Sequence, residues 1–201
     1  MFNRNNKLLL ILIAGGLIIV GAIVYSQNNK PQSNGAISIE ENIKGNPTSP
    51  VTITVFSDFQ CPFCANYHKT LQQISGNYPD KVYLVFKHFP LPGHPQSRSA
   101  ANAAECAAEQ GKFWEFADKL FENQARLGEN DFYQKIAADL NLNVSQFTDC
   151  ISSKKYNGKV EKNYQEGLSK KIKGTPASFI NGETLSGAAS YEKLKGIIDN
   201  L

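Results

Sequence analysis

The sequence is poor in the residue groupings that metal sites and nucleic-acid-binding proteins require. Its 201 residues include four cysteines and three histidines, but only one C-x-x-C and no pair of histidines at metal-ligand spacing. A zinc site would need two ligands beyond one C-x-x-C, so we expect no metal. All 18 acidic residues follow residue 35, as do 18 of the 21 basic ones, the other three being Arg4, Lys7 and Lys30. This balance gives no case for nucleic acid as a partner.

Charged residues are also missing between positions 8 and 25. This apolar run of 18 residues is at the lower end of what spans a bilayer as a helix. The basic residues Arg4 and Lys7 before it predict that the following chain lies outside the cytoplasm. We therefore expect a cytoplasmic N-terminus at 1–7 and an uncleaved transmembrane signal-anchor at 8–25. Cleavage after Ser26 is the alternative, and a lipoprotein is not expected because no cysteine lies near the run.

The chain after this run divides into a linker and one domain. Residues 26–46 are rich in Asn, Ser, Gly and Pro and predict a flexible tether. Residues 47–201 are enough for one hydrophobic core and contain no repeat. Apolar residues at helical spacing predict a helical insertion at about 96–171. Its helices are expected at 96–109, 113–121, 131–140 and 145–151, before a more polar stretch at 156–171.

The C-x-x-C, Cys61-Pro62-Phe63-Cys64, directly follows the β-branched and aromatic residues of a predicted buried strand at 51–57. If Cys61 caps a helix and Pro62 lies in its first turn, backbone N–H groups and the helix dipole stabilise the Cys61 thiolate. Apolar residues follow Cys64 at helical spacing, which turns its side chain toward the sheet. We therefore predict that an exposed Cys61 forms the mixed disulfide and that a buried Cys64 resolves it.

A second motif, Gly174-Thr175-Pro176, lies at the start of a predicted strand that runs into an Asn-Gly turn. This context favours a cis peptide bond before Pro176, with a trans turn proline as the alternative. A C-x-x-C after one strand and a Thr-Pro opening a later strand, followed by a hairpin and a closing helix, resemble the thioredoxin fold. The intervening helical stretch narrows the resemblance to the DsbA-like group of thiol–disulfide oxidoreductases.

The resemblance covers about residues 36–201. It implies an α/β thioredoxin fold with an inserted helical subdomain, here preceded by an N-terminal transmembrane helix. It places the group's nucleophilic cysteine on Cys61, its partner on Cys64 and its active-site cis-proline on Pro176. Thr175 would offer its backbone to an extended substrate segment, a form of strand addition. The residues expected to bind substrate are Thr175, Pro176, Pro62 and Phe63.

Two positions depart from better-known members of the group. Phe63 stands where the most strongly oxidising members have histidine, and phenylalanine can neither donate a hydrogen bond nor carry positive charge toward the Cys61 thiolate. Val55 stands where many thioredoxin-like proteins hold a buried acid. The nearby Asp58 is interpreted as a solvated turn residue, because Asp is a common turn former, with proton relay as the alternative.

The other two cysteines, Cys106 and Cys150, lie in the predicted helical insertion. Four cysteines in an oxidising compartment indicate two disulfides, so we expect a structural Cys106–Cys150 bridge. A second redox pair and two unpaired buried thiols are the alternatives.

The three histidines are interpreted as packing or solvated residues. His68 follows Cys64 by one turn on the redox helix, but its spacing places it off the face of the Cys61 thiol. His88 ends a strand and His94 lies in a loop between prolines. For these two, a place in the substrate groove is the alternative.

These features predict an exported, membrane-anchored enzyme that introduces disulfide bonds into secreted or cell-envelope proteins. Its substrates would be unfolded or reduced exported proteins. The resemblance implies a quinone-linked membrane partner, DsbB-like or similar to vitamin K epoxide reductase (VKOR-like), as the reoxidant. We expect a monomer with its catalytic domain on the periplasmic or extracellular side and no cofactor beyond the redox-active disulfide. A disulfide reductase or isomerase, and a non-catalytic peptide-binding chaperone, are the alternatives.

Overall fold

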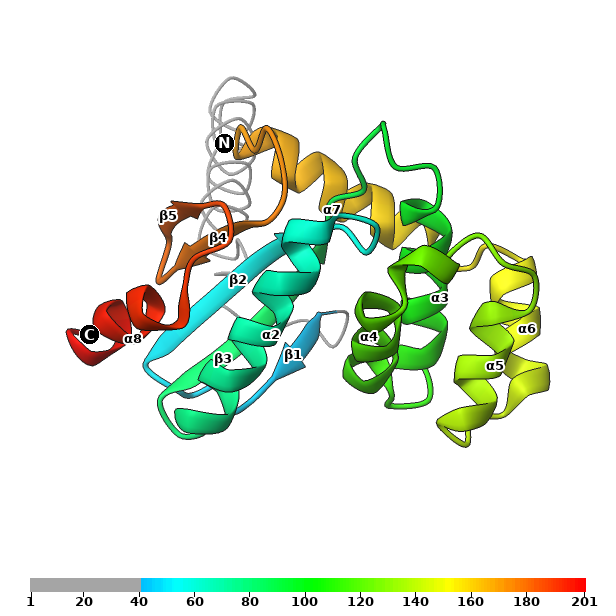
Figure 1. Cartoon of the computed structure of the whole chain (residues 1–201), viewed down its shortest axis with the longest axis horizontal. Coiled ribbons are helices and arrows are strands. Elements are labelled where there is room, and N and C mark those ends of the chain that lie inside the picture. The colour runs from blue at the N-terminus through cyan, green and yellow to red at the C-terminus, as the bar shows by residue number, and fades with distance from the viewer. Residues whose placement is uncertain (1–40) are drawn as a thin grey trace, which may run out of the picture. The chain divides into compact units, whose positions relative to one another are not determined.

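A run of β-branched and aromatic residues forms the central strand of a five-stranded sheet (Figure 1). The computed structural model describes residues 41–201, in which Val51–Ser57 (β2) pairs with a parallel neighbour, β3, and an antiparallel one, β4. The strand order is β1-β3-β2-β4-β5, and both outer strands are antiparallel to their neighbours. The other strands are Asn42–Lys44 (β1), Val82–His88 (β3), Ala177–Ile180 (β4) and Glu183–Ser186 (β5). This is the α/β arrangement expected from the sequence.

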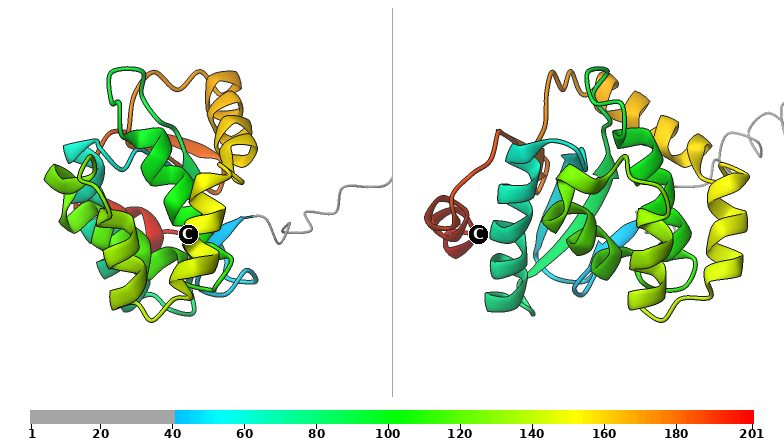
Figure 2. Two further views of the ribbon diagram at one scale, coloured as in Figure 1. Left: turned by 90° about the vertical axis from the view of Figure 1, so that its right-hand side faces the viewer. Right: turned by 45° about the vertical axis from the view of Figure 1, so that its right-hand side comes forward.

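The helix that carries the C-x-x-C and the C-terminal helix pack on the same face of the sheet (Figure 2). Pro62–Asn77 (α2) packs against β3, and its Tyr67 hydroxyl accepts a 3.0 Å hydrogen bond from the Ser178 hydroxyl of β4. Tyr191–Asp199 (α8) lies beside α2, and its apolar side chains join the same core. The first turn of α2 is thereby held at the end of β2.

One helix, Asn157–Ser169 (α7), covers the opposite face of the sheet. It comes so close that a Cβ atom at Gly167 would lie 2.4 Å from the Phe89 ring, so no larger residue fits there without a shift. Gly167 is in the last turn of α7, and the chain then runs directly to Pro176. The close packing therefore fixes the starting point of the segment that reaches the C-x-x-C.

The segment between β3 and the C-terminal hairpin is helical, as predicted. In addition to α7 it contains Ser97–Ala108 (α3), Phe113–Glu122 (α4), the 3-10 turn Gln124–Arg126, Phe132–Asp139 (α5) and Val144–Ser152 (α6). A disulfide joins Cys106 in α3 to Cys150 in α6, with Cα atoms 5.8 Å apart. The predicted pairing is confirmed, and the alternative of unpaired thiols is wrong.

The first strand, β1, lies inside the segment whose composition predicts a tether, so the tether prediction is wrong over these three residues. Ile43 is the one apolar residue of β1, which gives no strand signal of its own. The strand is held by distant partners: it pairs with β3, and the Trp114 indole N–H donates a 2.8 Å hydrogen bond to the Ile43 carbonyl. Contacts of this kind cannot be read from local composition.

The predicted cytoplasmic segment at 1–7 and signal-anchor at 8–25 lie outside the described residues. Within residues 41–201 the structure contains no helix of the length and hydrophobicity needed to cross a membrane. The signal-anchor therefore stays a prediction.

Candidate active site

The C-x-x-C lies where β2 gives way to α2, as predicted. Cys61 is the N-cap residue of α2 and Pro62 is in its first turn, where a missing N–H leaves no hydrogen bond unmade. The Cys64 backbone N–H donates a 3.1 Å hydrogen bond to the Cys61 carbonyl, and both side chains are free thiols. The local sequence thus places two thiols one helical turn apart at the positive end of a helix.

The exposure of the two cysteines differs less than the sequence predicted. Cys64 is 1% exposed and Cys61 only 3%, so the expectation of an exposed Cys61 is wrong. Cys61 is covered because the segment that contains Thr175 crosses in front of its sulfur. The exposed residue of the motif is Phe63, at 65%. Phe63 therefore presents an exposed aromatic ring two residues after Cys61.

The two thiols differ in acidity because their neighbours differ. A hydrogen bond with the Cys64 side chain, followed by contacts with Thr175 and with the backbone N–H groups of Cys64 and Phe63, lowers the pKa of Cys61 to about 5. Burial raises the pKa of Cys64, and its hydrogen bond with Cys61 raises it further. At neutral pH the pair therefore holds a thiolate at Cys61 and a neutral thiol at Cys64. This is the order of acidity that the sequence predicted.

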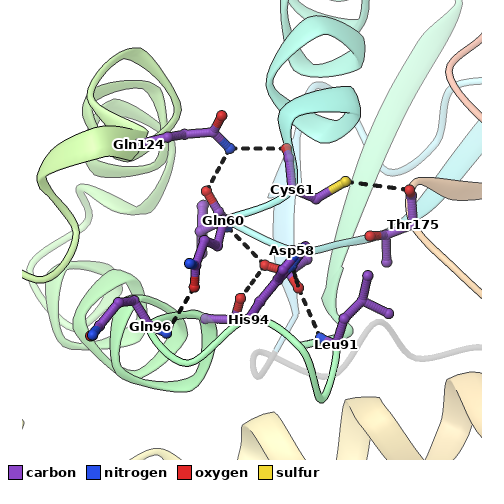
Figure 3. Close-up of polar contacts among 10 residues, drawn as sticks. Asp58, Gln60, Cys61, Leu91, His94, Gln96, Gln124 and Thr175 are labelled. Atoms are coloured by element: carbon purple, nitrogen blue, oxygen red, sulfur yellow. Dashed lines mark hydrogen bonds and ion pairs between the residues drawn. The ribbon is translucent and has the colours of Figure 1, made fainter.

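The peptide bond between Thr175 and Pro176 is cis, so the alternative of a trans turn proline is wrong. The Cys61 sulfur lies 3.5 Å from the Thr175 carbonyl oxygen, to which it donates a hydrogen bond when protonated (Figure 3). Within residues 41–201 the buried Thr175 hydroxyl has no hydrogen-bond partner, and its proximity lowers the pKa values of both Cys61 and Cys64. The fold thus brings together two motifs 114 residues apart and aims an unused donor at the sulfurs.

Asp58 is a buried structural acid, and its interpretation as a solvated turn residue is wrong. It is 1% exposed, and its carboxylate accepts 2.8 Å hydrogen bonds from the backbone N–H groups of Gln60 and Leu91. The same carboxylate pairs with His94 Nδ1 at 2.8 Å (Figure 3) and accepts a hydrogen bond from the Ser97 hydroxyl. Asp58 therefore joins the turn before Cys61 to the loop after β3. The sequence could not show this, because three of the four donors lie more than 30 residues away.

Two glutamines that the sequence analysis did not single out also hold the turn before Cys61 (Figure 3). The Gln124 side-chain amide donates hydrogen bonds to the carbonyls of Phe59 and Cys61, at 2.8 and 2.9 Å. The Gln60 side-chain carbonyl accepts a 2.8 Å hydrogen bond from the Gln96 backbone N–H. All three hydrogen bonds join this turn to the helical insertion, so the insertion positions the backbone beside the redox pair. A lone glutamine in a loop carries no sequence signal for such a role.

The histidines form buried or half-buried pairs with acids. His88 Nε2 lies 2.7 Å from Glu105, whose other oxygen accepts a hydrogen bond from Lys159, and His68 Nε2 lies 2.6 Å from Asp118. His88 and His68 are therefore packing residues, as interpreted. Within residues 41–201 no three His, Cys, Asp or Glu side chains are grouped as metal ligands would be.

Comparisons with known proteins agree with this architecture. A family model described as thioredoxin matches residues 38–200. The chain is 32% identical over 146 residues to a Na(+)/H(+) antiporter NhaA 1 of Mycolicibacterium gilvum, a match that covers 71% of this chain and 24% of the antiporter. The chain thus spans about a quarter of the length of this relative. It is 29% identical to the probable disulfide bond formation protein D of Bacillus anthracis, over 97% of this chain and 96% of the relative.

Solved structures show the same fold. The crystal structure of alpha-DsbA1 from Wolbachia pipientis has a TM-score of 0.71 at 24% identity, covering 80% of this chain and 90% of that one. That of oxidised BdbD from Bacillus subtilis has a TM-score of 0.72 at 23% identity, covering 80% and 92%. Together with the family match, these similarities confirm the thioredoxin fold with a helical insertion.

Proposed function

The chain belongs to the thioredoxin family, and from that premise we propose that it is a thiol–disulfide oxidoreductase that introduces disulfide bonds into exported proteins. The observation that carries the proposal is the contrast between Cys61, whose pKa is lowered to about 5, and Cys64, whose pKa is raised. A stabilised thiolate favours the reduced form of the pair, which is the property of a strong oxidant of protein thiols. The name of the Bacillus anthracis relative, a disulfide bond formation protein, supports the same direction.

The proposed reaction starts from a Cys61–Cys64 disulfide. A substrate thiolate attacks the Cys61 sulfur, the bond to Cys64 breaks, and Cys64 takes up a proton. A second substrate thiolate then attacks the substrate sulfur of the mixed disulfide, and Cys61 leaves as a thiolate, for which its low pKa suits it. Two substrate thiols become one disulfide, and two electrons pass to the Cys61–Cys64 pair.

Turnover requires an electron acceptor that reoxidises the pair. We assign this role to a quinone-linked membrane partner, DsbB-like or VKOR-like, and place the catalytic domain on the extracytoplasmic side of the membrane. The predicted signal-anchor at 8–25 and the presence of a Cys106–Cys150 disulfide support this location. Because the NhaA match covers only about a quarter of each antiporter, ion transport is not part of the proposal.

The test is the reduction potential of the Cys61–Cys64 pair in the full-length protein, measured by glutathione titration with Cys106–Cys150 intact. A potential near about −120 mV, as in DsbA, is expected for a stabilised Cys61 thiolate. A potential near about −270 mV, as in thioredoxin, would replace the oxidase proposal with a reductase. The Cys61→Ser variant is the control, because serine is close in size to cysteine and cannot form the bond.

The same Cys61→Ser variant separates the enzyme from a peptide-binding chaperone. An oxidase loses disulfide formation in a reduced, unfolded substrate when Cys61 is replaced. A chaperone would keep its full effect, namely suppression of aggregation of that substrate, with or without the Cys61 sulfur. If Cys61→Ser protects the substrate from aggregation as well as the wild type does and forms as many disulfides in it, the enzymatic proposal is overturned.

A further inference from the structure

A basic groove adjoins the Thr175–Pro176 segment and has no part in the chemistry described above. It has a volume of about 380 Å³ and lies between the loop that follows α7 and the outer face of the β4–β5 hairpin. Its floor carries alternate residues of the two paired strands, with Ala177 opposite Ser186 and Phe179 opposite Thr184. At one end it reaches Thr175, whose carbonyl is 3.5 Å from the Cys61 sulfur. A segment that occupies the part of the groove at Thr175 would therefore lie close to the Cys61 sulfur.

The wall of the groove is positively charged. Lys170, Lys171 and Lys173 all line it, and no Asp or Glu does. The Lys170 ammonium lies 5.1 Å from the centre of the Phe179 ring. Lys171 and Lys173 are exposed, and within residues 41–201 neither has an acidic partner. Two unneutralised charges at the end of a groove beside a redox-active cysteine create a local field that attracts anionic groups.

The backbone at Lys171 suggests that this lysine is not there to favour the local fold. Its φ is 60°, in the left-handed region, and it directly follows the last residues of α7. Helices commonly end on such a residue, and glycine or asparagine adopts the conformation with less strain than a lysine does. A lysine at this position therefore adds charge to the groove without improving the turn.

We propose that the groove binds extended protein segments that carry Asp or Glu close to the cysteine being oxidised. The inference rests on the proposed function and names its preferred substrates. A segment paired with the Thr175 backbone would be extended, so each residue advances about 3.3 Å and alternate side chains face the same way. Acidic side chains two to four residues from the cysteine then lie within about 14 Å of it, along the lysine-lined groove. The positive field of Lys171 and Lys173 would attract such acidic segments and so speed the encounter of the substrate cysteine with the Cys61 sulfur.

The test uses three peptides that differ only in the residues flanking two cysteines: Glu, Gln or Lys. The full-length oxidised protein is mixed with each reduced peptide, and the loss of the Cys61–Cys64 disulfide is followed by alkylation and mass shift. Each oxidised peptide gains one disulfide and passes two electrons to the pair. We expect the Glu peptide to react about tenfold faster than the Lys peptide at low salt, and the preference to shrink as salt screens the charges.

The chain offers a closely matched pair of variants. Lys171→Asn with Lys173→Gln removes the two groove charges, and asparagine tolerates the left-handed backbone. Lys154→Asn with Lys193→Gln removes two charges elsewhere, and Lys154 also has a positive φ, of 53°. Lys154 precedes the 13-residue helix α7 and Lys171 follows it, so the two lie roughly 20 Å apart. The two double variants thus lose the same charge and each change one residue with a positive φ, but only the first removes charges from the groove.

The proposal predicts that the groove variant loses the Glu-over-Lys preference and that the control variant keeps it. Each peptide serves as its own reference between proteins, so intrinsic differences in thiol acidity among the peptides cancel. An equal preference in wild type and groove variant, or none in wild type, would overturn the inference while leaving the oxidase intact. Failure of wild type to oxidise even the Gln peptide would instead count against the proposed function.

Discussion

The two cysteine pairs of this protein have nearly the same burial and opposite chemical settings. Cys61 and Cys64 are 3% and 1% exposed, and Cys106 and Cys150 are 0% and 5% exposed. The first pair lies at the start of α2 and consists of free thiols, whereas Cys106 and Cys150 lie in the last turns of α3 and α6 and form a disulfide. Burial therefore does not separate a candidate redox pair from a structural one.

What separates the pairs is the charge that their neighbours stabilise. The start of a helix presents N–H groups and a positive dipole end to Cys61, and the Thr175 hydroxyl adds a further donor. The ends of α3 and α6 present carbonyl groups and a negative dipole end, which disfavour a thiolate. A cysteine that cannot hold negative charge is a poor leaving group, so a disulfide in that setting exchanges slowly.

The largest expected effect tests the different roles proposed for Cys61 and Cys64. Cys61→Ser should reduce thiol–disulfide exchange to the uncatalysed background, because a serine hydroxyl forms no mixed disulfide. In Cys64→Ser the Cys61 thiolate should still attack a disulfide-bonded peptide and release one peptide thiol, and the resulting mixed disulfide should accumulate because no Cys64 thiol is present to resolve it. Mass spectrometry of alkylated samples distinguishes the two outcomes. Accumulation of a mixed disulfide in Cys61→Ser would reverse the assignment of roles.

The next effect tests the second pair. Replacing both Cys106 and Cys150 by alanine removes a cross-link between residues 44 apart, which the chain-entropy model values at about 4 kcal/mol of unfolding free energy. Denaturant unfolding of the wild-type and double-variant proteins measures the loss. The rate of peptide oxidation by Cys61–Cys64 should stay within about twofold at a temperature where both are folded. A large loss of rate with unchanged stability would make the second pair a redox relay.

The sequence predicted the local geometry of the two motifs better than it predicted their surroundings, and the reason is distance along the chain. The helix start, the orientation of Cys64 and the cis bond at Pro176 follow from residues adjacent to each motif. The burial of Cys61 depends on Thr175, 114 residues away, and Gln124 supports its backbone from 63 residues away. Local patterns specify dihedral angles and faces, whereas covering contacts depend on how distant segments meet.

The burial of Asp58 also depends on residues far away in the sequence. An aspartate in a turn is interpreted as solvated because turns are usually at the surface. Here the loop after β3 closes over that turn, and the carboxylate becomes the acceptor for donors on both segments. The interpretation failed because a distant loop covers the turn, and the residues next to Asp58 in the sequence do not predict the path of that loop.

The smallest expected effect tests the contribution of the Thr175 hydroxyl to the low pKa of Cys61. Thr175→Val keeps the shape of the side chain and removes the hydroxyl, which contributes to the low pKa of Cys61. We expect the pKa to rise by up to about 1 unit, equivalent to about 1.4 kcal/mol, and the pair to become less oxidising by up to about 30 mV. The pH dependence of Cys61 alkylation in the reduced protein measures the shift. Thr175→Ser is the control, because it keeps the donor.

The sign of the accompanying stability change follows from the direction of the shift. The pKa of Cys61 falls from an ordinary value of 9.0 to about 5 on folding, so its thiolate stabilises the reduced protein fully above pH 9. That contribution is lost as the pH falls toward 5, and the oxidised protein lacks it altogether. Thr175→Val should make this contribution smaller and complete its loss at a higher pH, whereas Thr175→Ser should follow the wild type. If valine and serine variants titrate alike, the helix start and Cys64 alone account for the acidity of Cys61, and the hydroxyl is only a packing group.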